Sequence, residues 1–188
     1  MAIRFSRPSE EVLQSLLVAA RSDSLTYAPV GMSADARPPK GYRLERYSRS
    51  LGSGDHVFDS AVSALKQWRV HEGSGLTVLA EGPPVAGSVV AMVAPIPLGF
   101  IDVVCQVVHV VNQPDRYGFA YGTLSVHPEQ GEESFTVVRG RDGEITFEIV
   151  SVSRPRHVLA RVAGPIARRL QRAATAKYFA AMQAEVAK

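Results

Sequence analysis

Three strands and the turns between them are encoded in residues 117–153, which read YGFAYGTLSVHPEQGEESFTVVRGRDGEITFEIVSVS. Large and small side chains alternate, as expected of strands with one buried face. The dipeptide Asp142-Gly143 is a strong signal for a tight β-hairpin. The predicted strands are 117–126, 133–139 and 144–153, and residues 127–131 are predicted to form a loop.

The last of these strands has a broken period. Ile145, Phe147 and Ile149 point to one face, but Val150 and Val152 then place valines on the other. Because side chains alternate strictly along a regular strand, this change predicts a β-bulge.

Upstream, residues 85–111 contain no Lys or Arg and a single acid, Asp102. Their length alone would suffice to span a bilayer. However, prolines and glycines interrupt the segment, and its apolar residues are mostly valine, which favours strands. We therefore predict two strands, 85–93 and 102–111, and no membrane span.

The remaining segments complete an element order. An amphipathic helix is predicted over 8–17, a strand over 43–50, a helix from residue 55 to Trp68, and a long helix over 164–186. Residues 27–42 are rich in Pro and Gly and are predicted to form a covering loop. We predict one α+β domain, residues 1–188, with the helix and loop of 1–42 in front of a core at 43–188.

The order strand, helix, six strands and long terminal helix resembles the helix-grip fold of START-like proteins. In that arrangement a curved antiparallel sheet of about seven strands packs on the C-terminal helix. A gap between sheet and helix would form an apolar cavity. On the terminal helix, one apolar stripe is predicted, made of Ile166, Leu170, Ala173, Ala174 and Ala181.

Composition sets wider limits on the class of protein. The chain has 188 residues, 46% of them hydrophobic and 21% charged, which excludes a disordered chain or a plain coiled coil. The single cysteine, Cys105, excludes an intramolecular disulfide, and a buried unreactive thiol is expected. The polar residues 1–11 do not resemble a secretory signal, so a cytoplasmic location is expected.

The net charge of +3 conceals an uneven distribution. Residues 151–188 carry eight basic side chains and one acid, whereas the preceding residues have a net charge of −4. Arg168 and Arg172 share one helix face, and the stem of Lys177 is expected to pack on the apolar stripe. This face either is simply solvated or contacts an acidic partner. Nucleic acid is disfavoured because alanines, not base-stacking aromatics, lie between the basic residues.

Two motifs point to a family. FAYGTL at 119–124 and HPEQGEESF at 127–135 resemble the signature of an uncharacterised family of bacterial and plant proteins. The segment LGSG at 51–54, followed by Phe58, Leu65 and Trp68 at helical spacing, also fits that pattern. The resemblance implies a START-like, Bet v 1-like fold and carries no established activity.

His127, Glu132 and Glu133 form the most polar cluster within these motifs. Imidazole and carboxylate groups could bind a metal or transfer a proton. Their spacing matches no zinc motif, so no metal and no cofactor are predicted. The favoured interpretation is structural: His127 anchors its loop, and Glu132 or Glu133 accepts backbone N–H bonds across residues 128–131.

Other residues are candidate ligand contacts. Tyr121 could present its hydroxyl to a cavity, and Arg154 could close the cavity mouth or pair with Glu132 or Glu133. Trp68 is expected to pack between helix and sheet. Gly52-Ser53-Gly54 resembles a phosphate-binding loop, but a flexible helix entrance is favoured because the Walker lysine is missing.

Three functions are compatible with these observations. The leading hypothesis is a protein that binds a small apolar or amphipathic molecule between the sheet and the terminal helix. Its tentative ligand contacts are Trp68, Tyr121, His127, Glu133 and Arg154. Alternatively, an enzyme could use Tyr121, His127, Glu133 and Arg154 as acid–base or orienting groups. The third possibility is an interaction module that uses the basic terminal helix.

Overall fold

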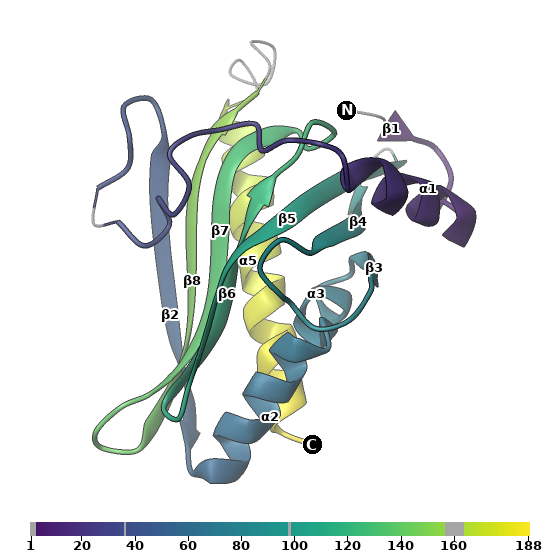
Figure 1. Ribbon diagram of the computed structural model, residues 1–188. Coiled ribbons are helices and arrows are strands. Elements are labelled where there is room, and N and C mark those ends of the chain that lie inside the picture. The colour runs from purple at the N-terminus through teal and green to yellow at the C-terminus, as the bar shows by residue number, and fades with distance from the viewer. Residues whose placement is uncertain (1–2, 36, 98, 157–163) are drawn as a thin grey trace.

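The structure of the chain is a computed structural model that describes residues 3–35, 37–97, 99–156 and 164–188. Eight strands and four helices are found in these ranges (Figure 1). The strands are β1 (Ile3–Arg4), β2 (Arg43–Ser53), β3 (Thr77–Ala80), β4 (Val89–Ile96), β5 (Gly99–Gln113), β6 (Arg116–Thr123), β7 (Glu129–Arg139) and β8 (Glu144–Pro155). The helices are α1 (Glu10–Ala20), α2 (Asp55–Lys66), α3 (Arg69–Gly73) and α5 (Gly164–Val186).

Seven of the strands form a continuous antiparallel sheet in the order β2-β8-β7-β6-β5-β4-β3. The short β1 pairs with the beginning of β5, at Phe100 and Ile101. Figure 1 shows this sheet curving around α5, with α2 and α3 beside the C-terminal half of that helix. The predicted helix-grip architecture is confirmed, including the six strands between the helices.

The inner, concave face of the sheet holds the main core. Phe119, Phe135 and Phe147 come from three adjacent strands and are almost completely buried. They pack against Leu65 of α2 and Met182 of α5. Each large apolar side chain buried in this way contributes about 1.5–3 kcal/mol to folding. The sheet and the helices therefore pack on one another mainly along the C-terminal half of α5.

The outer face of the sheet is covered by segments from the N-terminal part of the chain. Leu13 and Leu17 of α1 pack on β4 and β5. Tyr27 and Met32, from the loop after α1, pack on Val152 of β8. This second apolar layer explains why β8 carries apolar residues on both of its faces, with Val150 and Val152 on the outer one. The predicted bulge at these valines is wrong, because β8 pairs without a register shift around Val150 and Val152 and has both faces covered near Val152. The register shift between β2 and β8 lies at the other end of the pair, between Ser50 and Gly52 of β2.

Two other boundaries differ from the prediction. Strand β7 begins at Glu129, so most of the predicted loop at 127–131 belongs to the sheet. The predicted helix through Trp68 breaks into α2 and α3, because Trp68 itself adopts a left-handed backbone conformation with φ of 59°. This break turns the Trp68 ring toward Phe119 of β6, at a centroid distance of 5.0 Å. The expected packing between helix and sheet is confirmed.

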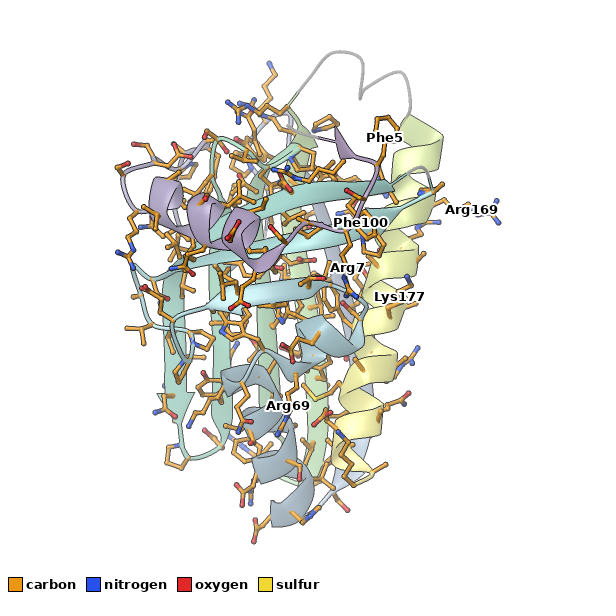
Figure 2. All side chains as sticks on the ribbon, turned by 90° about the vertical axis from the view of Figure 1, so that its right-hand side faces the viewer. Phe5, Arg7, Arg69, Phe100, Arg169 and Lys177 are labelled. Atoms are coloured by element: carbon orange, nitrogen blue, oxygen red, sulfur yellow. The ribbon has the colours of Figure 1, made fainter. Side chains whose placement is uncertain are left out.

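The buried face of α5 differs from the predicted alanine stripe. Thr175, Tyr178, Phe179 and Met182 are buried, together with Ala181. Ala173 and Ala174 are exposed, because the helix turns its larger side chains into the curved sheet. The side chains of Ile166, Arg168 and Leu170 lie outside the described residues. Arg169 and Lys177 are exposed and project from α5 (Figure 2), so the Lys177 stem does not join the buried stripe.

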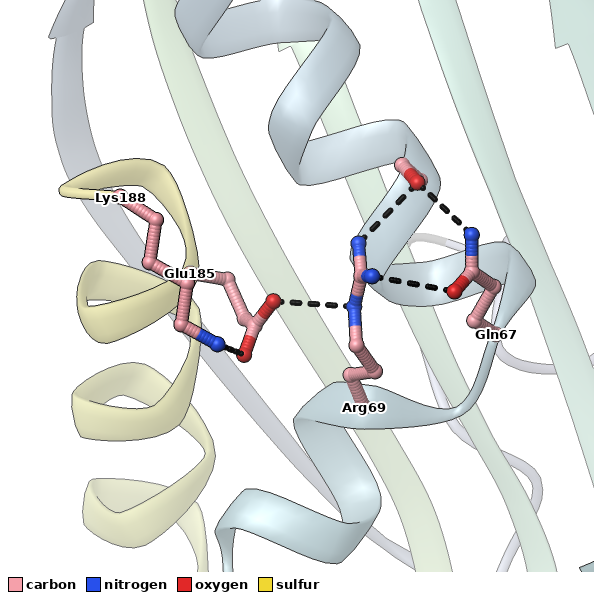
Figure 3. A network of polar contacts seen from close by, with 5 residues as sticks. Gln67, Arg69, Glu185 and Lys188 are labelled. Atoms are coloured by element: carbon pink, nitrogen blue, oxygen red, sulfur yellow. Dashed lines mark hydrogen bonds and ion pairs between the residues drawn. The ribbon is translucent and has the colours of Figure 1, made fainter.

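A polar network fastens α3 to the end of α5 (Figure 3). The guanidinium of Arg69 donates to Ser63 Oγ and Gln67 Oε1, both at 3.0 Å. Its Nε lies 2.9 Å from Glu185 Oε2, which forms an ion pair between the two helices. Glu185 also pairs with Lys188. These contacts hold the C-terminal half of α5 in place.

The valine-rich segment forms two strands, as predicted, but with other bounds: β4 is shifted to Val89–Ile96, and β5, at Gly99–Gln113, extends beyond the predicted 102–111 at both ends. Within the described ranges, no helix is both long enough and apolar enough to cross a membrane.

Candidate functional site

The concave face is not apolar throughout. One row across four strands consists of Tyr121 on β6, Glu133 on β7, Ser151 on β8 and Glu45 on β2, each opposite the next in register. Alternation places Glu129 and Ser153 on the same face, further toward the ends of β7 and β8. We call these six residues the polar end of the concave face: Glu45, Tyr121, Glu129, Glu133, Ser151 and Ser153.

Direct contacts link the polar end to its surroundings. The Tyr121 hydroxyl donates a hydrogen bond of 2.9 Å to Glu133 Oε2. Gln171 of α5 donates its amide N–H to Ser151 Oγ at 3.3 Å, which shows that α5 faces this row. The polar end therefore lies between the sheet and the N-terminal half of α5, above the aromatic core.

The acidity of Glu133 is strongly altered. Burial raises the pKa of its carboxyl group to about 7, and the hydrogen bond from Tyr121 opposes that rise. The nearby carboxylates of Glu129 and Glu45 raise it further. The pKa of Glu129 is also raised, again mainly by burial. Glu133 is therefore partly protonated near neutral pH, where it can accept or release a proton.

Beneath the polar end lies a histidine surrounded by aromatic rings. The His71 ring is fully buried, and its centroid is 4.7 Å from that of Phe135, 5.3 Å from Tyr178 and 5.8 Å from Tyr121. Neither ring nitrogen has a hydrogen-bond partner among the described residues. Burial lowers the pKa of this imidazole to about 3, so it is neutral at physiological pH.

The structure brings together three of the five predicted ligand contacts. Tyr121 and Glu133 are hydrogen-bonded, and the Trp68 ring lies 5.0 Å from His71 beneath them. The Trp68 indole N–H donates to the carbonyl oxygen of Gly82 at 2.9 Å, so its polar group is already satisfied.

His127 and Arg154 make other contacts. His127 Nδ1 accepts the backbone N–H of Glu129 at 3.0 Å, which agrees with the favoured interpretation that His127 anchors its turn. Burial lowers the pKa of this imidazole to about 4. The Arg154 guanidinium donates to Gln130 Oε1 at 3.1 Å and lies 4.6 Å from the centre of the Tyr42 ring. Its described partners are therefore not Glu132 or Glu133.

Glu132 corrects another expectation. Its carboxylate does accept backbone N–H bonds, but from the loop after α1 and not across residues 128–131. The donors are the N–H of Gly31 at 2.5 Å, the N–H of Ser33 at 2.9 Å and the hydroxyl of Tyr27 at 2.8 Å. Glu132 is 2% exposed and lies on the outer face, so it fastens the covering loop to the sheet.

Two glycines of the motifs have clear structural reasons. A Cβ atom on Gly122 would lie 2.1 Å from the Tyr27 hydroxyl oxygen, so only glycine leaves room for that ring. Gly131 has φ of 151°, and a Cβ atom there would lie 2.0 Å from the Val152 carbonyl oxygen. Gly122 therefore lets the Tyr27 ring of the covering loop approach the sheet, and Gly131 lets β7 approach the backbone of β8.

Sequence reasoning missed several members of the site. Glu45, Glu129, His71 and Tyr178 were not singled out. The spacing Glu129-Gly131-Glu133 was a usable signal, because alternate residues of a strand share a face. No comparable local signal marks Glu45, since its place in the row depends on the pairing of β2 with β8 about a hundred residues later.

Three remaining features can be placed briefly. Cys105 is fully buried and burial raises the pKa of its thiol, which agrees with the expected unreactive cysteine. Gly54 precedes α2 with φ of 103°. Within the part of the chain that the structure describes, no group of three His, Cys, Asp or Glu side chains is placed to hold a metal ion.

A curved antiparallel sheet that grips a C-terminal helix, with a polar end facing that helix, defines a protein of the helix-grip class. The chain matches the family model described as "Domain of unknown function (DUF1990)" over residues 26–181. Because the match covers most of the chain, the protein belongs to this family, and the resemblance found in its motifs is confirmed.

Curated relatives agree with this assignment, and solved structures share the fold. A UPF0548 protein of Deinococcus radiodurans is 29% identical over 93% of both chains. Another, from Arabidopsis thaliana, is 28% identical over 77% of this chain and 71% of its own length. Among solved structures, a hypothetical protein of Helicobacter pylori has a TM-score of 0.57 at 9% identity, covering 84% of this chain and 98% of that one. Ara h 8.0201 has a TM-score of 0.50 at 12% identity, covering 78% of this chain and 98% of that chain. These two likenesses concern the fold alone.

Proposed function

We propose that this protein binds a small amphipathic molecule between the concave face of its sheet and α5. The observation that carries the proposal is the partly exposed carboxyl group of Glu133, which is hydrogen-bonded to Tyr121 on an inner face. Inner faces of sheets that serve only packing are lined by apolar side chains. A carboxyl group kept there, with its pKa raised to about 7, is typical of a binding or reacting group.

The change of polarity along the concave face suggests how the molecule would be oriented. The row below contains Phe119 and Phe135, with Tyr178 of α5 packed against Phe135, whereas the polar end above contains hydroxyl and carboxyl groups. An amphipathic ligand would set its apolar body against Tyr121 and Tyr178 and direct its polar group toward Glu133. Ligand sites commonly combine an apolar lining with a few placed polar groups in this way.

The first test is native mass spectrometry of the full chain purified under mild conditions. We expect a mass adduct that is lost on denaturation. The molecule bound in this adduct should then be extracted and its mass determined. Glu133→Gln should reduce the fraction of protein that carries the adduct.

The matched control is Glu148→Gln. Glu148 lies between the inward-facing Phe147 and Ile149 on β8, so its side chain is on the outer face, and the substitution removes the same charge from the same sheet. It should leave the adduct unchanged. Only the unmodified mass for the wild type, with no thermal shift across a panel of amphipathic metabolites, would contradict the proposal.

A second candidate function is acid–base catalysis on the bound molecule. It is favoured by one specific observation, the carboxyl group of Glu133 with a pKa of about 7 and a tyrosine hydroxyl 2.9 Å away. A group that titrates near the working pH is well suited to proton transfer. Incubating the extracted ligand with fresh protein tests this function. Conversion that is abolished by Glu133→Gln even at ligand concentrations that saturate the variant would support an enzyme, and unchanged ligand would support a binding protein.

A further inference from the structure

The polar end contains more negative charge than its described partners balance. Glu45, Glu129 and Glu133 all face inward, and the charges of Glu45 and Glu129 act on Glu133. Three carboxyl groups sharing one partly buried region repel one another when ionised. This arrangement of carboxyl groups therefore favours the binding of a positively charged group.

Two described cations lie near the polar end. Arg43 forms an ion pair with Glu45 Oε1, although the Arg43 side chain remains 44% exposed. Arg172 of α5 lies near Tyr47 and is exposed. Among the described residues, no Lys or Arg forms an ion pair with Glu129 or Glu133, although the charge of Arg43 partly opposes the rise in the pKa of Glu129. Glu133 is hydrogen-bonded to the Tyr121 hydroxyl, and Ser153 hydrogen-bonds to Glu129.

An independent observation points to a missing hydrogen-bond donor. The Glu45 side chain is only 10% exposed and lies beside the Tyr47 hydroxyl, and its second oxygen, Oε2, is buried without a well-formed hydrogen bond among the described residues. The fully buried His71, whose ring lies against Tyr121 and Tyr178, has two further ring nitrogens without partners. A buried polar atom without a partner costs about 1–3 kcal/mol, and such groups commonly mark the place of a ligand or water.

We propose that the ligand is an amphipathic amine, whose protonated ammonium group binds at Glu133 and Glu45 while its apolar body lies against the rings of Tyr121 and Tyr178. This inference rests on the proposed ligand-binding function and adds the chemical class of the ligand. An ammonium group has three N–H donors and no acceptor, which suits carboxylate oxygens. A carboxylate or phosphate head group would instead meet like charge.

Three compounds of similar shape and different charge provide the test: 1-naphthylmethylamine, 1-naphthalenemethanol and 1-naphthoate. Binding of each to the full chain is measured by isothermal titration calorimetry at pH 8, where Glu133 is mostly ionised. We expect the amine to bind at least about tenfold more tightly than the carboxylate, a difference of about 1.4 kcal/mol. The neutral alcohol should lie between the two.

Variants assign the effect to the polar end. Glu133→Gln should weaken binding of the amine by about tenfold and change that of the alcohol by less than about twofold, because a charge-assisted hydrogen bond is lost. Glu148→Gln on the outer face should change neither. Circular dichroism and thermal unfolding should show that both variants are folded.

The outcomes separate the two proposals. If the alcohol or the carboxylate binds as tightly as the amine, the amine proposal is overturned and ligand binding remains supported. The amine proposal is also overturned if Glu133→Gln and Glu148→Gln weaken the amine equally. If none of the three compounds binds and the native mass spectrum shows no adduct, both proposals fail.

Discussion

Two adjacent residues, Glu132 and Glu133, lie on opposite faces of β7 and have opposite surroundings. The outer carboxylate of Glu132 is 2% exposed and accepts three hydrogen bonds from the loop after α1. The inner carboxyl of Glu133 is partly exposed and accepts one, from Tyr121. Since one residue step along a strand reverses the face, neighbours of the same type acquire different tasks.

Within one motif, this difference distinguishes a structural carboxylate, Glu132, from a candidate functional one, Glu133. A carboxylate whose oxygens are all occupied by donors of its own chain has nothing left to offer a ligand. A carboxyl group with few partners, in a region where burial raises its pKa to about 7, still has capacity to bind. The comparison thus indicates that the outer face was built for stability and that the inner face is the one to probe for function.

The largest expected effect is that of Glu132→Ala. Removing the carboxylate leaves the Tyr27 hydroxyl and the N–H groups of Gly31 and Ser33 without acceptors. Because each buried donor without a partner costs about 1–3 kcal/mol, we expect the free energy of unfolding to fall by about 3 kcal/mol or more. Chemical denaturation monitored by Trp68 fluorescence measures this change.

Glu148→Ala serves as its control, because Glu148 is also on the outer face but has no described side-chain hydrogen bond. It should alter the unfolding free energy by less than about 0.5 kcal/mol. Equal losses in the two variants would show that Glu132 does not fasten the loop, and the comparison with Glu133 would lose its basis.

The second prediction concerns His71 of α3, which is buried against the inner face of the sheet and whose ring nitrogens have no hydrogen-bond partner among the described residues. Its pKa is lowered to about 3 by burial, so unfolding takes up a proton as the pH falls below the ordinary histidine value of about 6.5. The stability that the neutral ring supports is present at pH 7 and is lost progressively from about pH 6.5 toward pH 3. Between pH 7 and pH 5 this linkage amounts to about 2 kcal/mol.

The control is His71→Phe, which retains a ring among aromatic neighbours and removes the titrating group. Urea unfolding of both proteins at pH 7 and pH 5 gives the loss of stability for each. The wild type should lose about 2 kcal/mol more than the variant. His127 titrates in both proteins and therefore cancels in the difference. Identical losses would show that His71 does not carry the acid sensitivity.

A third, smaller effect is expected for Tyr27→Phe. This substitution removes one of the three donors of Glu132 and leaves the ring packed on Gly122. A single hydrogen bond to a charged group contributes about 1.5 kcal/mol, so a loss of about 1–2 kcal/mol is expected. In a double variant with Glu132→Ala, the Tyr27→Phe substitution should add almost nothing, because the two residues act on the same contact. Full additivity would contradict the assigned bond.

How far the sequence could predict these features depends on the range of the contacts. The hairpin at Asp142-Gly143 and the strand alternation are local signals, and both were confirmed. Tyr121 and Glu133 were both singled out, but their hydrogen bond could not be inferred without the register of β6 on β7. The partners of Glu132 lie about a hundred residues earlier in the chain, so no spacing within the motif could indicate them.

Misjudged elements have a related cause. The valines at 150 and 152 were interpreted as a bulge because a second apolar layer on the outer face was not foreseen. Likewise, the buried face of the terminal helix was predicted from a stripe of Ile, Leu and Ala residues. The curvature of the sheet instead leaves room for Tyr178 and Phe179. In both cases the sequence pattern was correctly observed, and its meaning depended on which segment packs opposite.

The smallest expected change in stability is that of Glu133→Gln, and its sign gives the comparison its most demanding test. Because burial raises the pKa of Glu133 to about 7, the folded state becomes less stable as the pH rises from about 4.5 to 7, and the loss is complete above that. Glutamine removes the charge and keeps an oxygen for the Tyr121 hydroxyl. After allowance for solvent screening, the variant should be about 1 kcal/mol more stable than the wild type at pH 8, a rise in Tm of roughly 2–4 °C. At pH 4 the two proteins should have equal Tm, because the carboxyl is then protonated in the fold. If Glu133→Gln lowered Tm at pH 8, as Glu132→Ala is expected to do, Glu133 would have to be regarded as a second structural carboxylate.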